Sequence, residues 1–221
     1  AGSWVIPQQP GASRDGGVRA AVEAAGSELA LDFVSVAVAP DVARHEAPVP
    51  RVALWHTWLD TEMNGWVRLL LDAEKIPYDL IRDEEIRAGG LRQRWDVLLY
   101  AHSYYGVKRQ ILGIDPRHGA MPYTKTAAFP SHGYPDASDD ITGGIGWSGM
   151  ENLKRFLDEG GLMVTLGNGS ALPLEGGLVR YVDREGEGVS TPGVELTAKF
   201  WKAGHPLGYG YPETTSVFRS L

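Results

Sequence analysis

The fold is decided by residues 51–101, which read RVALWHTWLDTEMNGWVRLLLDAEKIPYDLIRDEEIRAGGLRQRWDVLLYA. A short apolar run at 52–56 is typical of a buried strand. Apolar residues then recur at helical spacing, which predicts a helix with Trp66 and Leu70 on its inward face. Residues 78–81 and 95–101 predict two more strands. Strands that alternate with helices in this way indicate an α/β fold with a mostly parallel sheet flanked by helices.

The same alternation continues toward the C-terminus. Ser148 and Glu151 have the spacing of a capping box, which predicts the start of a helix that ends at Gly160. Residues 162–166 predict a fourth strand, and a Gly-Asn-Gly-Ser turn follows it. We expect residues 102–146 to form a long loop because they are rich in Gly, Pro, His, Ser and Tyr. Further strands are expected at 178–182, 193–200 and 216–218.

Residues 1–50 differ from the rest because Pro and Gly punctuate both of their ends. Between these ends, the pattern predicts a short helix that stops at Gly26 and a strand over residues 29–38. We therefore expect residues 1–50 to be a linker and residues 51–221 to be one domain.

Composition excludes several classes of function. The chain has 221 residues, a formal net charge of −7 and no cysteine. An acidic chain offers no basic field for a nucleic-acid backbone, so we expect no nucleic-acid partner. No apolar stretch approaches the roughly 20 residues that cross a bilayer, so we expect no membrane partner. The absence of cysteine removes disulfides, thiolate metal ligands and cysteine nucleophiles.

Catalytic groups in doubly wound folds gather at the carboxyl ends of the strands. After the fourth expected strand, a nucleophile elbow would place its nucleophile at Gly169, which has no side chain. A shift of one residue would place Ser170 there, with His205 as its base. Pro173 follows so closely that we expect a helix to start late or not at all. The alternative interpretation is a tight turn that only ends the strand.

Other loops at this edge offer binding groups rather than a complete catalytic set. His102, His118 and His132 match no spacing of metal ligands, so we predict no metal site. Glycines before the helix at 148 could bind an anion, and aromatic side chains could stack on a sugar or a peptide, although core packing is the alternative for the tryptophans. The ligand-binding candidates are His56, Trp58, Asp60, Glu62, His102, Tyr104, Tyr105, Gly143, Gly144 and Asn168.

Three runs together suggest a family: residues 52–101, then GGIGWSGMENLKRFLDEGGLMVTLGNGSALPLE at 143–175, then PGVELTAKFWKAGHPLGYG at 192–210. They resemble the C-terminal domain of bacterial zinc carboxypeptidases of the carboxypeptidase A-like family. The resemblance implies a flavodoxin-like fold of the class I glutamine amidotransferase type over residues 51–218. It also implies a secreted or periplasmic parent protein.

The resemblance does not imply that this chain is itself catalytic. The family's zinc-binding H-x-x-E pair does not occur in this chain, so zinc is expected only in an upstream peptidase domain, and this chain is expected to hold no cofactor. A glutamine amidotransferase needs an elbow cysteine, which this chain lacks. The resemblance therefore implies a non-catalytic accessory domain that contacts the upstream peptidase domain, forms a homo-oligomer or binds a ligand. The alternatives are a serine hydrolase that uses Ser170 and His205, or a module that binds a sugar or a peptide.

Overall fold

The computed structural model describes residues 5–6, 17–42, 46, 48–182, 193–202, 204–208 and 210–219. The chain forms two compact units. One unit is Ala47–Gly186, and the other combines Ala1–Glu46 with Glu187–Leu221. No helix among the described residues is long and apolar enough to span a membrane.

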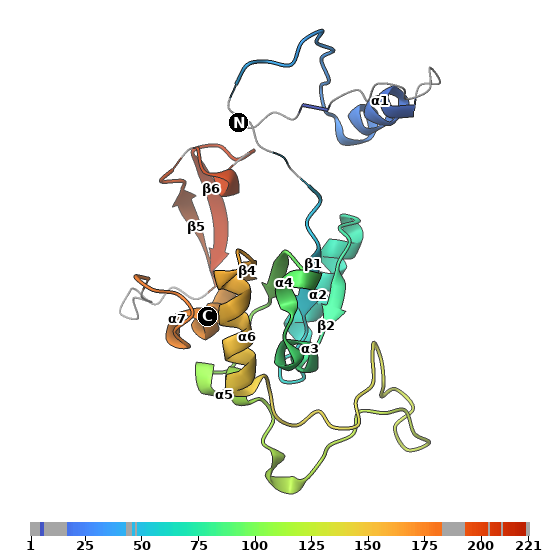
Figure 1. The fold of residues 1–221 in the computed structure, drawn as a ribbon, viewed down its shortest axis with the longest axis vertical. Coiled ribbons are helices and arrows are strands. Elements are labelled where there is room, and N and C mark those ends of the chain that lie inside the picture. The colour runs from blue at the N-terminus through green and yellow to red at the C-terminus, as the bar shows by residue number, and fades with distance from the viewer. Residues whose placement is uncertain are drawn as a thin grey trace. The chain divides into compact units, whose positions relative to one another are not determined.

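Four parallel strands form the sheet of the unit Ala47–Gly186, in the order β2-β1-β3-β4 (Figure 1). They are β1 (Val52–Trp55), β2 (Asp79–Ile81), β3 (Val97–Tyr100) and β4 (Leu162–Thr165). The register pairs Trp55 with Tyr100, and Tyr100 with Thr165. The expected α/β fold with a parallel sheet is thus confirmed, and each strand lies where its apolar run predicts it.

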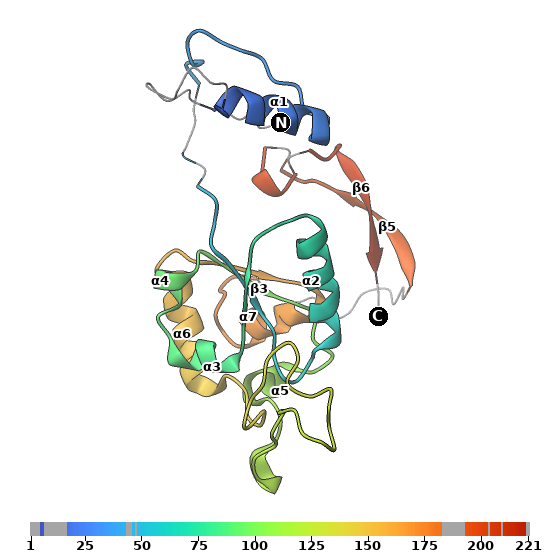
Figure 2. The same cartoon turned by 90° about the vertical axis from the view of Figure 1, so that its right-hand side faces the viewer.

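Helices lie on both faces of the sheet (Figure 2). Helix α2 (Glu62–Ala73) is on one side, while α3 (Asp83–Ala88), α4 (Leu91–Arg94) and α6 (Gly146–Asp158) are on the other. This division follows from right-handed crossovers, because the chain moves one way along the sheet from β1 to β2 and the opposite way from β2 to β4. The remaining helices of this unit are α5 (Val107–Leu112), the 3₁₀ turns η1 (Pro116–His118) and η2 (Gly167–Ser170), and α7 (Ala171–Glu175).

The core lies between the sheet and the α3, α4 and α6 side. Trp55 from β1 stacks on Tyr100 from β3 with ring centroids 4.4 Å apart. Leu153 and Phe156 of α6 are fully buried against them. Leu54, between Ala53 and Trp55 in β1, is also fully buried but points to the opposite face, as the alternation of a strand requires.

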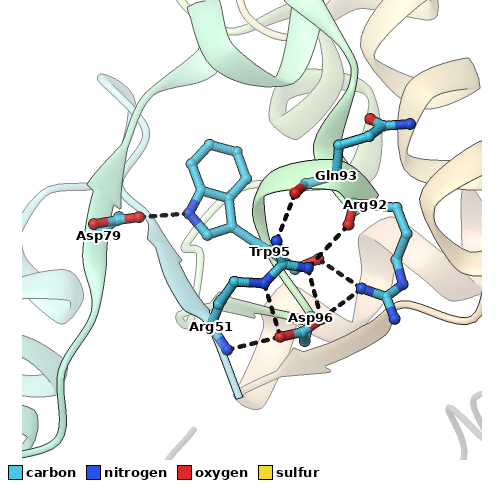
Figure 3. A network of polar contacts seen from close by, with 6 residues as sticks. All are labelled: Arg51, Asp79, Arg92, Gln93, Trp95 and Asp96. Atoms are coloured by element: carbon cyan, nitrogen blue, oxygen red, sulfur yellow. Dashed lines mark hydrogen bonds and ion pairs between the residues drawn. The ribbon is translucent and has the colours of Figure 1, made fainter. Parts of the chain in front are cut away.

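The amino ends of β1 and β3 are joined by a network of charged side chains (Figure 3). Arg51 donates from Nε to Asp96 Oδ2 at 3.0 Å and from Nη2 to Asp96 Oδ1 at 2.9 Å, and its third nitrogen donates to the carbonyl of Gln93. Arg92 also donates to Asp96. Hydrogen bonds from Arg51 hold the pKa of Asp96 far below its ordinary value. Both carboxylate oxygens and all three guanidinium nitrogens of this pair therefore have partners.

The other unit contains α1 (Gly17–Leu29) and an antiparallel pair, β5 (Val194–Lys199) and β6 (Thr214–Arg219), with the 3₁₀ turn η3 (Pro206–Gly208) between the two strands. The helix before Gly26 is confirmed but extends three residues further, to Leu29. The strand predicted at 29–38 was wrong, since these apolar residues are largely exposed and form no ladder. The strands predicted at 193–200 and 216–218 are confirmed.

Some details of the sheet unit also differ from expectation. Residues 178–182 form bends and irregular chain instead of a strand. The capping box was wrong: α6 begins at Gly146, and Ser148 lies inside its first turn. Trp66 and Leu70 are 64% and 59% exposed, so their predicted inward orientation was wrong, because α2 turns Asn64 and Leu71 toward the sheet instead.

Candidate ligand site at the carboxyl ends of the strands

His56 follows β1 directly and is the most unusual side chain at this edge. It is only 4% exposed, and neither ring nitrogen has a hydrogen-bond partner within the described part of the chain. Burial, followed by the positive charge of Arg82, lowers the pKa of His56 to about 4. The imidazole is therefore neutral at pH 7 and offers one N–H donor and one acceptor nitrogen.

Arg82 follows β2 and ties a distant segment to this edge. Its guanidinium donates to the carbonyl of His56 at 2.9 Å and to Asp136 at 2.7 Å, and it lies 3.9 Å from the ring centroid of Trp58. Asp136 belongs to the long connection between α5 and α6. Tyr123 of the same connection packs against Trp58 with ring centroids 5.6 Å apart. This connection therefore covers the carboxyl end of β1.

The first turn of α2 contains a second group without a partner among the described residues. Asn64 is 1% exposed, and its Nδ2 donates to the carbonyl of Asp60 at 3.1 Å, but its Oδ1 accepts no hydrogen bond from the described residues. The indole nitrogen of Trp58 likewise has no partner there. The Ser103 hydroxyl, from the loop after β3, donates to the Asp60 carboxylate. The loops after β1 and β3 thus meet at this point.

The loops after β3 and β4 are joined by several hydrogen bonds. The backbone N–H of Asn168 donates to Nδ1 of His102 at 3.1 Å. The Asn168 side-chain amide donates to the carbonyls of Ser103 and Tyr105 at 2.9 and 3.0 Å. Gln110 donates to the carbonyls of Tyr105 and Asn168. Three candidates, His102, Tyr105 and Asn168, are thereby brought together through Nδ1 of His102, the carbonyl of Tyr105 and the side-chain amide nitrogen of Asn168.

The turn after β4 has no room for a nucleophile at its centre. A Cβ on Gly169 would lie 2.4 Å from the carbonyl oxygen of Ala101. Helix α7 begins at Ala171, so the expectation of a late helix or none was wrong. Pro173 fits the first turn of α7, where the lack of an N–H costs no helical hydrogen bond.

Ser170 and His205 belong to different units, so their pairing stays a prediction. Among the described residues, no side chain hydrogen-bonds the hydroxyl of Ser170. The His205 Nδ1 accepts the backbone N–H of Leu207 at 3.2 Å.

The remaining candidates are spread over other surfaces. Gly143 and Gly144 line a hollow of about 870 Å³ beside α5, together with Lys108, Arg109 and Gly113. None of the other candidates is in that lining. Glu62 begins α2 and is exposed, and Tyr104 is 61% exposed with its ring edge-on to His102.

The three loop histidines lie in different surroundings. His132 stacks between Tyr123 and Phe129, with ring centroids 4.7 and 4.8 Å away. His118 is an exposed residue of η1. Across the ranges that the structure describes, no group of three or more His, Asp or Glu side chains is arranged to hold a metal ion.

Sequence reasoning missed four residues of this edge: Asn64, Arg82, Ser103 and Asp136. Arg82 could have been found because it directly follows the predicted strand at 78–81, and Ser103 because it lies two residues after the predicted strand at 95–101. Asn64 interrupts the apolar face of a predicted helix, which is itself a signal of an unusual environment. Asp136 carries no local signal, since it reaches the edge only through the tertiary course of a long connection.

Comparison with known protein families, with curated proteins and with solved structures finds no match for this chain.

Proposed function

We propose that the unit Ala47–Gly186 is a non-catalytic domain that binds a small peptide at the carboxyl end of β1. The observation that carries the proposal is His56, a neutral imidazole that is 4% exposed and whose two nitrogens have no hydrogen-bond partner among the residues that the structure describes. Leaving buried polar groups without hydrogen bonds costs about 1–3 kcal/mol, so such groups are kept where they have a role. A peptide unit supplies both an N–H and a carbonyl, which match the two ring nitrogens.

The neighbouring groups support this assignment. Asn64 Oδ1 is a second acceptor, and the Trp58 indole N–H is a second donor, and both are free for a ligand in the described contacts. Arg82 and Asp136 form an ion pair over the same loop, so their charges offset each other. The residues Tyr123 and Asp136 that cover this edge come from one long connection, which must shift to admit a ligand.

A binding role rather than a catalytic one is supported by the turn after β4. Gly169 stands where an elbow nucleophile would stand, and the backbone of Ala101 leaves no space for a side chain there. The chain also has no cysteine.

The finer fold and the parent protein belong to the same proposal. The order β2-β1-β3-β4 agrees with the first four strands of the flavodoxin-like order 2-1-3-4-5, which supports a domain of the class I glutamine amidotransferase type. The sequence resemblance supports an accessory role in a secreted or periplasmic zinc carboxypeptidase. Zinc and catalysis would then belong to the peptidase domain. A parent protein isolated from its source with an antibody to this chain should be far larger than 24.0 kDa and carry about one zinc.

The ligand assignment is tested by titrating the 221-residue chain with a panel of tripeptides while tryptophan fluorescence is recorded. We expect a saturable change with at least one peptide and at least a tenfold weaker affinity in His56→Leu. Trp58→Phe should remove most of the signal, whereas Trp147→Phe, at an exposed position of α6, should retain it. A panel of methyl glycosides is the comparison arm. The proposal is overturned by a response to glycosides alone, by no response, or by a response that His56→Leu leaves unchanged.

A further inference from the structure

Arg82 binds a carboxylate that belongs to the protein itself. Its Nε donates to Asp136 Oδ2 at 2.7 Å and its Nη2 donates to Asp136 Oδ1, so the guanidinium holds the carboxylate through two parallel hydrogen bonds. Its Nη1 donates to the carbonyl of His56 at 2.9 Å, and Trp58 lies against its face. Arg82 therefore presents a carboxylate-binding edge beside His56, and Asp136 occupies that edge.

Asp136 lies on the solvent side of this ion pair. The Arg82 side chain is 7% exposed, whereas the Asp136 side chain is 37% exposed. Water can solvate Asp136 when its side chain turns outward, but Arg82 cannot lose its charge and would be left buried without an anion. A second carboxylate that takes the place of Asp136 keeps the buried charge balanced. The exchange of one carboxylate for another therefore costs little.

The segment that carries Asp136 is attached so that its far end can move. Residues 113–145, all of which the structure describes, contain one 3₁₀ turn and two isolated bridges but no longer helix or strand (Figure 1). At the base, Ile114 and Gly143 donate to each other's carbonyls at 3.1 and 2.6 Å. At the far end, the contacts include the ion pair with Arg82 and the packing of Tyr123 on Trp58. Opening these two contacts uncovers the carboxyl end of β1 without breaking the base.

We infer that Asp136 is an autoinhibitory side chain, which holds the position on Arg82 that a carboxylate of the bound peptide takes. The inference rests on the proposed peptide site and narrows its ligand to peptides that carry a carboxylate, at the C-terminus or on an acidic side chain. The ligand carboxylate replaces Asp136 on Arg82, and the adjoining peptide units bind His56 and Asn64.

This exchange sets how tightly a ligand must bind. A side chain on a connected segment has an effective concentration on the order of millimolar at its partner. A carboxylate that contacts Arg82 alone must exceed that concentration, whereas a peptide that also bonds His56 displaces Asp136 at a lower one. The apparent affinity for the peptide is reduced by the fraction of molecules in which Asp136 occupies Arg82. Removal of Asp136 should therefore tighten binding.

The first experiment compares matched peptides on the 221-residue chain. The tripeptide that binds best in the fluorescence titration is used as its free acid and as its C-terminal amide, each with Glu or Gln at the middle residue. We expect loss of one of the two carboxylates to weaken binding about tenfold or more, which identifies the carboxylate that binds. Asp136→Ala should tighten binding of the form with that carboxylate about tenfold more than binding of the form without it. Asp139→Ala, at an exposed position of the same connection, is the matched control and should change neither.

A second experiment needs no peptide. Asp136→Ala leaves a position beside the buried guanidinium that a small carboxylate fits. Acetate should therefore raise the midpoint of thermal unfolding of Asp136→Ala more than that of the wild type. Sodium chloride at the same ionic strength is the control for screening. The melting curves also show whether the variant is folded, and Asp136→Asn, which retains the side-chain shape, takes its place in the peptide comparison if it is not.

Three results would overturn the inference: equal binding of all forms of the peptide, Asp136 variants that bind the carboxylate form no more tightly than the wild type, or acetate that stabilises Asp136→Ala no more than chloride does. Failure of the proposed function gives a different pattern. If no peptide binds, or if His56→Leu leaves binding unchanged, both proposals are overturned, whatever acetate does. If binding requires His56 but not a carboxylate on the peptide, only the present inference fails.

Discussion

The two ends of the parallel strands differ in how completely their polar side chains are hydrogen-bonded. At the amino ends, Arg51 and Asp96 use all their side-chain polar atoms on each other and on nearby groups. At the carboxyl end of β1, His56 and Asn64 are more deeply buried, yet they retain polar atoms without partners among the described residues. Buried groups should be the better satisfied ones, because water cannot serve them.

This contrast indicates which end is built for stability and which for binding. The Arg51–Asp96 ion pair, whose side-chain polar atoms all have partners, fixes the strands where they begin, although Nε of the adjacent Arg92 has no partner among the described residues. Unpartnered donors and acceptors cost stability, and they persist where a ligand can satisfy them. Changing residues at one end at a time should therefore separate stability from binding.

The largest effect is expected at Gly169. A Cβ there would meet the Ala101 carbonyl at 2.4 Å, so Gly169→Ala should lower the free energy of unfolding by about 3 kcal/mol in urea denaturation. The matched control is Gly65→Ala, in the interior of α2, where an added Cβ meets nothing within 4 Å. That change should stabilise the protein by about 0.5–1 kcal/mol because alanine is the better helix former. If Gly169→Ala leaves the free energy of unfolding unchanged, the turn after β4 has room for a side chain at this position, and the steric argument against a nucleophile there is wrong.

The ion pair that closes the long connection over His56 should give the next largest effect. Arg82 is 7% exposed in its side chain, so Asp136→Asn would leave a buried cation without its carboxylate. We expect a loss of about 2 kcal/mol in the free energy of unfolding. Asp139→Asn, at an exposed position three residues away, should change it by less than about 0.5 kcal/mol. Equal effects of the two variants would show that the ion pair does not fasten the connection.

The pH dependence of stability separates His56 from Asp83, whose carboxylate accepts a hydrogen bond from the indole of Trp55. The pKa of His56 is lowered from 6.5 to about 4, so the unfolded chain binds more protons in this range and the His56 contribution is lost as the pH falls from about 6.5 to 4. Burial raises the pKa of Asp83 from 3.8 to about 6, so its contribution is lost as the pH rises from about 4 to 6. The two slopes oppose each other in the wild type.

In a variant that lacks one of the two groups, the free energy of unfolding should show the pH dependence of the other group alone. His56→Leu should leave the free energy of unfolding falling with rising pH between about 4 and 6, while Asp83→Asn should leave it rising. Each slope differs from that of the wild type by up to about 1.4 kcal/mol per pH unit. Urea denaturation at several pH values measures both. Parallel curves for the wild type and His56→Leu would show that His56 does not titrate as a buried group.

The sequence was sufficient for the parallel sheet but not for the contacts at its edge. Apolar runs such as 52–56 and 95–101 carry their own signal because strands buried on both faces need no polar residues. The apolar stretch at 29–38 was wrongly predicted to be a strand, because its composition does not reveal whether a neighbouring strand exists to pair with it. Trp66 was placed inward because periodicity identifies an apolar side of a helix but cannot tell the sheet-facing side when both sides are apolar.

The candidate site was predicted in part. Strand ends correctly marked His56, Asp60, His102 and Asn168 as residues of the carboxyl edge. Their hydrogen bonds could not be predicted, because Asn168 and His102 are 66 residues apart and meet only through the pairing of β3 with β4. Arg82 and Asp136 depend in the same way on how the long connection folds back.

The difference between the two strand ends is tested most directly by measuring how His56→Leu and Asp96→Asn change the free energy of unfolding at pH 7. We expect the two changes to have opposite signs. His56→Leu replaces an unpartnered imidazole by an apolar side chain of similar size. It should raise the free energy of unfolding by about 1 kcal/mol while weakening peptide binding. Asp96→Asn breaks the ion pair with Arg51 at the amino ends and should lower the free energy of unfolding without affecting binding. If His56→Leu instead destabilises the protein as Asp96→Asn does, the imidazole is a structural element and the carboxyl end of β1 is not a ligand site.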